Sequence, residues 1–121
     1  MTDGAPPPPP EPAVQKAVIN QLRQFGGDAL IQSVVKVFLS TAPDRLKAIR
    51  AGVVANDAAK VASEAHALKS SAGQLGAVKM AELLEQAEQG GIDKRLDGLG
   101  KVLAALEAEF VRVHAELSPL A

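Results

Sequence analysis

His66 is the residue of this sequence best suited to chemistry, because a histidine ring nitrogen is largely uncharged, and therefore nucleophilic, near neutral pH. Lys69 follows three residues later, a spacing that places the two side chains side by side if the segment is helical. A cation in this position attracts phosphoryl oxygens and helps to keep the imidazole unprotonated. Phosphoryl transfer depends mainly on positioning and on charge stabilisation, so this pair is suited to holding a phosphoryl group on histidine.

The segment around His66 has the pattern of a helix with one buried side. At about 100° per residue, its apolar residues fall on the side of the helix away from His66, which predicts an outward-facing histidine. These apolar residues are Val61, Ala65, Leu68, Ala72 and Leu75. The histidine's own side is lined by small residues, where a solvated helix normally carries long charged ones. They are Ala62, Ser63, Ser70 and Gly73. Such a bare surface allows another macromolecule to approach the imidazole closely.

Glu88 is the candidate for orienting the imidazole, because it lies at the rim of the apolar face of the following helix. An antiparallel neighbour would bring this carboxylate near His66. There it could accept a hydrogen bond from Nδ1 and leave Nε2 available for attack. The alternative, which the pattern leaves open, is a solvated glutamate in a run with Glu82 and Glu85.

Helical periodicity with short connections predicts an all-α fold, an up-down-up-down antiparallel four-helix bundle with a short extra N-terminal helix. Gly26 and Gly27 are expected to end the short helix, Pro43 to kink or restart the next one, and Gly76 to form a turn. The expected helices cover approximately residues 13–25, 28–53, 58–74, 77–89 and 93–117.

Composition limits the classes of function. The 121 residues suit one domain, which we place at residues 13–121 after a disordered Pro-rich tail at residues 1–12. A net charge of −1 and 2% aromatic residues argue against a nucleic-acid partner. The sequence has no cysteine, and it shows neither a signal peptide nor an apolar run long enough to span a membrane. We therefore expect a cytoplasmic monomer with no metal site and no membrane partner.

Residues 65–77 read AHALKSSAGQLGA, and this stretch resembles the signature of histidine phosphotransfer (HPt) domains of two-component phosphorelays, roughly A-H-x-L-K-G-S-A-x-x-L-G. The helix that follows in the family carries L-E or a glutamine in its later part, and here Ala87 and Glu88 stand at that spacing from His66. The order of the helices matches from Ala13 to the end of the sequence, but only the core motif is specific.

The resemblance implies a phosphorelay intermediate without an ATP site of its own. It would take a phosphoryl group from an aspartyl-phosphate on one receiver domain and pass it to another. Its partners would be response-regulator receiver domains, a hybrid histidine kinase, or both. By the family motif, His66 is the phosphoacceptor, Lys69 the phosphoryl-stabilising cation and Glu88 the residue that hydrogen-bonds the imidazole. Gly73 and Gly76 fill the small and turn positions. This chain needs no cofactor, and Mg²⁺ is expected in the partner receiver.

A receiver would cover His66 by packing on the small face, and its expected docking residues are Ala62, Ser63, Ser70 and Gly73. Ser70 departs from the family, which usually has glycine after the lysine. Serine is small enough to keep the surface open, so an altered partner preference is expected rather than a lost function.

Three other readings compete with this one. A nucleotide-using kinase is disfavoured because no phosphate-cradling loop of the G-x-x-x-x-G-K-[ST] type is present. A di-iron bundle needs paired Glu-x-x-His motifs, but Ser63 precedes His66 and Val111 precedes His114 at that spacing. The third alternative is a non-catalytic helical-bundle interaction module in which His66 is not phosphorylated.

Overall fold

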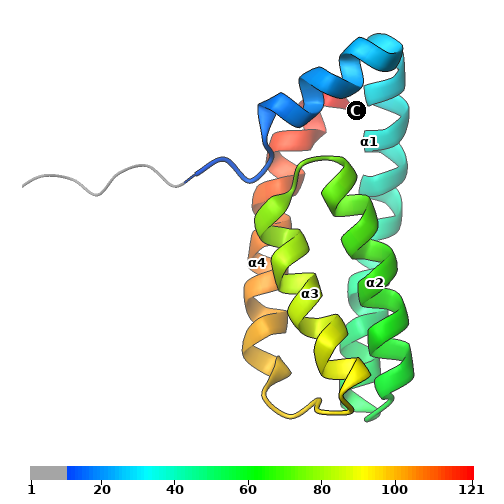
Figure 1. The fold of residues 1–121 in the computed structure, drawn as a ribbon, viewed down its shortest axis with the longest axis vertical. Coiled ribbons are helices and arrows are strands. Elements are labelled where there is room, and N and C mark those ends of the chain that lie inside the picture. The colour runs from blue at the N-terminus through cyan, green and yellow to red at the C-terminus, as the bar shows by residue number, and fades with distance from the viewer. Residues whose placement is uncertain (1–10) are drawn as a thin grey trace, which may run out of the picture.

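Four α-helices joined by short turns account for most of residues 11–121, the part of the chain that the computed structural model describes. They are α1 (Lys16–Val54), α2 (Ala58–Gln74), α3 (Val78–Ile92) and α4 (Leu99–Leu117), followed by one 3-10 turn, η1 (Ser118–Leu120). Successive helices run in opposite directions along the long axis of the molecule (Figure 1). The predicted all-α, up-down-up-down bundle is confirmed. Most of the predicted Pro-rich tail, residues 1–10, lies outside the described residues.

The short N-terminal helix of the prediction forms the first turns of α1. Gly27 has φ 68° and ψ −165°, values that are not helical and that break α1 into two parts. A positive φ is readily adopted only by glycine, which is why the chain changes direction at this residue. The part before Gly27 lies across one end of the bundle, and the part after it forms one of the four long rods (Figure 1).

The predicted restart at Pro43 is wrong, because α1 continues through Pro43 and has non-helical angles only at Gly27. A proline removes one N–H from the helical ladder but leaves the rest of the helix able to form. Ala42, Leu46 and Ile49 are all buried, so the same face of α1 packs on the core before and after the proline. This shared packing face holds the helix in one piece.

The predicted start of the last helix at Asp93 is also wrong, since α4 begins at Leu99. Lys94 and Gly98 both have positive φ, 57° and 90°, which no helix can contain. The N–H of Arg95 donates to the carbonyl of Gly90 (2.8 Å) and so closes the end of α3. The residues between α3 and α4 therefore form turns.

Gly76 forms the predicted turn between α2 and α3, with φ 77°. Its carbonyl accepts a hydrogen bond from the N–H of Gln15 (3.0 Å). A Cβ at Gly76 would lie 2.9 Å from Cβ of Val18, closer than side chains tolerate. The turn thus packs directly against the start of α1, and this contact fixes where α3 begins relative to α2.

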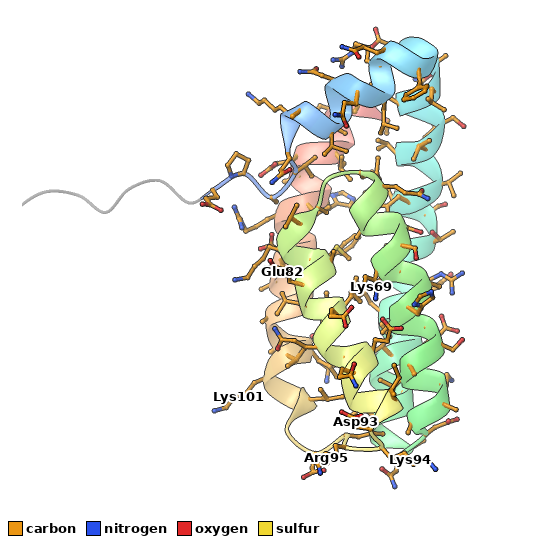
Figure 2. All side chains as sticks on the ribbon, in the orientation of Figure 1. Lys69, Glu82, Asp93, Lys94, Arg95 and Lys101 are labelled. Atoms are coloured by element: carbon orange, nitrogen blue, oxygen red, sulfur yellow. The ribbon has the colours of Figure 1, made fainter. Side chains whose placement is uncertain are left out.

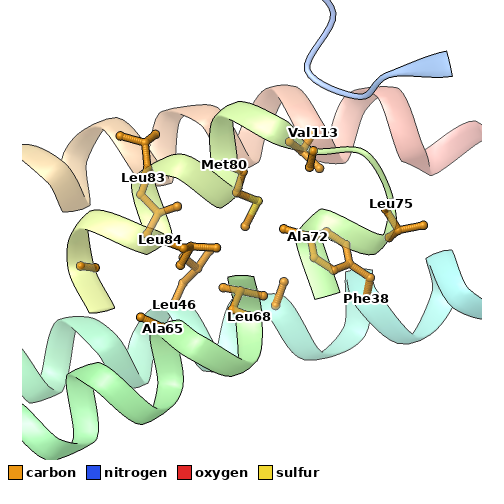
Figure 3. Packing of buried hydrophobic residues seen from close by; sticks show 14 of the residues in the cluster. Phe38, Leu46, Ala65, Leu68, Ala72, Leu75, Met80, Leu83, Leu84 and Val113 are labelled. Carbon is orange, nitrogen blue, oxygen red and sulfur yellow. The ribbon is translucent and has the colours of Figure 1, made fainter. Parts of the chain in front are cut away.

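The core is built from apolar side chains of all four helices (Figure 3). The apolar stripe predicted for α2 is fully buried, and apolar side chains of α3 and α4 are buried with it, among them Met80, Leu84, Leu106 and Val113. Phe38 of α1 packs on Phe110 of α4 with ring centroids 6.2 Å apart. Phe25 is 89% exposed, because it lies next to the break at Gly27 and points away from the bundle. Within residues 11–121, no helix has the length and apolar character needed to cross a membrane.

Two side chains of α4, Arg112 and Glu116, bind the backbone of residues 11–14, and we call this pair the terminal clamp. Glu116 accepts hydrogen bonds from the backbone N–H groups of Ala13 (2.8 Å) and Val14 (2.9 Å). Arg112 donates to the carbonyl oxygen of Glu11. The first described residues are therefore fastened to the last helix.

Candidate functional site

The N-terminus of α2 and its buried stripe together fix the direction in which His66 points. Asp57 caps the helix by accepting a hydrogen bond from the N–H of Lys60 (3.1 Å). Ala65 and Leu68, on either side of His66, have no exposed surface. The intervening histidine must consequently face outward, and 63% of its side chain is exposed.

The close approach of α2 and α3 brings the rim of α3 over the histidine. A Cβ on Gly91 of α3 would lie only 2.7 Å from the carbonyl oxygen of Ala58 and from the N–H nitrogen of Ala62. The two backbones can approach this closely only because residue 91 has no side chain. Side chains one turn earlier on α3 can then reach across to the outer face of α2.

Glu88 lies within hydrogen-bonding distance of His66, with its Oε2 2.8 Å from the imidazole Nδ1. An ionised carboxylate can only accept hydrogen bonds, so Nδ1 must carry the proton. In that tautomer Nε2 keeps its lone pair, and no hydrogen bond of Nε2 is present among residues 11–121. The Glu88 side chain itself is mostly covered, with 13% of its surface exposed.

Lys69 extends from α2 toward α3 (Figure 2), and two carboxylates of α3 are within ion-pair distance of its ammonium group. Its Nζ donates a hydrogen bond to Oε1 of Glu85 (2.7 Å) and forms an ion pair with Oε1 of Glu88 (2.6 Å). Glu88 therefore contacts His66 through one oxygen and Lys69 through the other. The four side chains form a continuous polar cluster across the α2–α3 interface.

The ionisation of this cluster follows from these contacts. The pKa of the Lys69 ammonium is raised above its ordinary value, first by the hydrogen bond to Glu85 and then by the one to Glu88. The pKa of Glu88 is lowered, mainly by the hydrogen bond from Lys69 and to a lesser degree by the one from His66. Burial acts in the opposite direction on Glu88. At neutral pH Glu88 is thus a charged acceptor for the imidazole.

The predicted docking residues lie along the outer face of α2. Ser63, Ser70 and Gly73 are exposed, whereas Ala62 is half-buried beside Gly91. A Cβ added at Gly73 would meet nothing within 4 Å, so the surface in front of it is open. Their role in docking stays a prediction.

A hollow of about 220 Å³ adjoins this face between α1 and α2, and sequence reasoning did not find it. Exposed Val37 of α1 lines it together with Ser71 and Gln74, which lie one and two turns beyond His66. It offers an apolar recess next to the small residues of α2.

The sequence pattern places Glu85 among solvated glutamates, whereas the structure places it in the polar cluster. The signal that could have identified it is register. Lys69 follows His66 by three residues on α2, and Glu85 precedes Glu88 by three on the antiparallel α3. A hydrogen bond between His66 and Glu88 therefore places Lys69 opposite Glu85.

Comparisons with known proteins identify the family and the fold of the chain. The sequence model described as Hpt domain matches residues 33–116, a range that contains the whole polar cluster. No curated protein matches the chain at a significant level. Among solved structures, the chain is similar to histidine-containing phosphotransfer protein B (HptB) from Pseudomonas aeruginosa PAO1. The TM-score is 0.83 and the identity 22%, over 89% of this chain and 93% of that chain, a likeness that concerns the fold.

Proposed function

The chain belongs to the Hpt domain family, and from this premise we propose that His66 accepts a phosphoryl group from the aspartyl-phosphate of a receiver domain and passes it to another receiver. Membership of the family makes the domain a histidine phosphotransfer carrier of two-component signalling. The choice of residue, partners and direction is the proposal. It is carried by one observation: an exposed imidazole whose Nδ1 is 2.8 Å from a covered carboxylate of Glu88.

The transfer step requires no proton to enter or leave the imidazole. The lone pair of Nε2 attacks the phosphorus of the receiver's aspartyl-phosphate. An N–P bond forms, the acyl O–P bond breaks, and the receiver's aspartate leaves as a carboxylate. The ring keeps its proton on Nδ1, so positive charge develops on it, and the Glu88 carboxylate at 2.8 Å stabilises that charge. Transfer to a second receiver is the same step in reverse.

Lys69 supplies positive charge beside the reacting nitrogen. Its ammonium group donates a hydrogen bond to Glu85 and forms an ion pair with Glu88, so a phosphoryl oxygen would share this cation with both carboxylates. In this proposal, the receiver brings Mg²⁺ with its own aspartate, and this domain contributes no metal.

The partner would pack on the small outer face of α2 and on the adjoining hollow. Ser63, Ser70 and Gly73 allow a helix or loop of the receiver to approach His66, and Val37 offers an apolar contact on α1. Alignment of the aspartyl-phosphate with Nε2 requires such close approach, because phosphoryl transfer depends on positioning of the two reacting groups.

Transfer from a phosphorylated receiver to the purified domain tests the proposal. We expect acid-labile, base-stable phosphate on the wild-type chain and none on His66→Gln. His114→Gln is the matched control, because it removes the other histidine, on α4, and should be labelled normally. Absence of label with several receivers that bind the domain would instead indicate the non-catalytic interaction module.

A further inference from the structure

Lys69 is held by two carboxylates of unequal exposure. Glu88 has 13% of its side chain exposed and also contacts His66, whereas Glu85 has 57% exposed and, within residues 11–121, forms an ion pair only with Lys69. The hydrogen bond from Lys69 to Glu85 (2.7 Å) is nevertheless the largest single cause of the raised pKa of the Lys69 ammonium. The more exposed carboxylate is therefore an important partner of the lysine before any phosphoryl group arrives.

A phosphoryl group on Nε2 would change the balance of charge in this cluster. Before phosphorylation, two carboxylates surround one ammonium group. A phosphohistidine adds up to two further negative charges next to the same lysine. The covered Glu88 is needed by the imidazole, so the partner that Lys69 can give up is Glu85, whose exposed ion pair is weakly held.

We propose that Glu85 is a positioning residue that competes with the phosphoryl group for Lys69, and that its carboxylate thereby limits how much phosphate rests on His66. This inference depends on the proposed function of His66. A domain with a lower tendency to retain the phosphoryl group passes it on to the next receiver more readily. Glu85 would thus adjust the transfer equilibrium without touching the reacting atoms.

Replacing Glu85 with glutamine tests this competition, because glutamine keeps the size and removes the charge. Glu82→Gln is the matched control. Glu82 lies one turn earlier on the same helix, it is exposed, and among residues 11–121 it forms no ion pair (Figure 2). Both variants change the net charge of the domain by the same amount, so non-specific electrostatic effects on a receiver are matched.

The quantity to measure is the equilibrium constant for transfer between a receiver and His66, which does not depend on how tightly the two proteins dock. Glu85→Gln should raise the proportion of phosphohistidine at equilibrium by about two- to five-fold, the range expected for removing an exposed charge pair. Glu82→Gln should leave it at the wild-type value. A second readout is the titration of the Lys69 ammonium by NMR, whose pKa should fall in Glu85→Gln and stay unchanged in Glu82→Gln.

Labelling with phosphoramidate distinguishes a failure of the inference about Glu85 from a failure of the proposed function of His66. This small donor transfers its phosphoryl group to a histidine with loss of ammonia and needs no docking. Labelled wild-type protein with equal equilibrium constants for Glu85→Gln and Glu82→Gln would overturn the inference and leave the proposed function standing. Wild-type protein that takes no label at His66 from either phosphoramidate or receivers would overturn both.

Discussion

The imidazole of His66 and the carboxylate of Glu88 meet across the α2–α3 interface, with Nδ1 2.8 Å from Oε2. The second oxygen of the same carboxylate is 2.6 Å from Nζ of Lys69. One covered glutamate therefore links the nucleophile to the cation, and the orientation of both depends on the packing of two helices.

Lys69→Ala should slow phosphoryl transfer more than it weakens docking. The ammonium group acts on the transferring group, while the small residues of α2 form most of the proposed contact surface. Single-turnover transfer measured over a range of domain concentrations separates the maximal rate from the apparent affinity. Lys101→Ala on α4 is the control, since Lys101 is exposed and is distant from α2 in sequence and fold. A normal maximal rate in Lys69→Ala would contradict the electrostatic role.

Glu88 should make the stability of the domain depend on pH in the acid range. Its pKa in the folded protein lies below the ordinary value of 4.5, mainly because of the hydrogen bond from Lys69. A lowered folded pKa gives stability that is fully present above the unfolded pKa and is lost as pH falls through the folded pKa. Urea unfolding of wild type and Glu88→Gln should therefore differ most near pH 6 and converge at lower pH, within about pH 5 to 2. A difference that stays constant across this range would contradict the assignment.

Leu68→Ala should destabilise the domain by about 2–5 kcal/mol, the usual cost of truncating a fully buried leucine. Leu68 lies at the centre of the buried face of α2 (Figure 3). Ser70→Ala, on the exposed side of the same helix, should change the free energy of unfolding by less than about 0.5 kcal/mol. Denaturant unfolding of the two variants measures both. A nearly neutral Leu68→Ala would mean that the helix has a different rotational phase.

Two substitutions at Gly73 should affect the stability of the domain and its affinity for a receiver separately. Because a Cβ at this position meets nothing within 4 Å, Gly73→Ala should stabilise the domain by up to about 1 kcal/mol through helix propensity. Gly73→Arg should fold normally but bind a receiver more weakly, since its side chain would occupy the open face. Gly100→Arg on α4, where the space is also open, is the matched control for binding. Equal receiver affinities for the two arginine variants would argue against docking on this face.

The sequence predicts well those features that depend on one helix at a time. Val61, Leu68 and Leu75 were placed in the core correctly, because a spacing of three and four residues needs no knowledge of the neighbouring helix. The prediction of a restart at Pro43 fails because the loss of one hydrogen bond is a local effect, whereas the packing of α1 on the core extends to both sides of the proline. Leu96 lies three residues before Leu99 and so continues the helical spacing of α4 backwards, although the left-handed backbone of Lys94 and Gly98 excludes a helix over residues 93–98.

The contacts within the polar cluster could be predicted only in part from the periodicity of the sequence. The rim position of Glu88 and the family motif together suggested its position beside His66. The pairing of Glu85 with Lys69 depends on the register of two antiparallel helices, and that register is set by the turn at Gly76 and the close contact at Gly91. A helical wheel describes each helix separately and contains no such register.

The terminal clamp has a mechanical consequence. Glu116 and Arg112 tie the chain at residues 11–14 to the last turns of α4, so the first and last described segments are fastened side by side. A pull applied at the two ends of the domain would load this contact before it stretched α2 or α3. The clamp would therefore have to break before such a force reached the helices that carry His66 and Glu88.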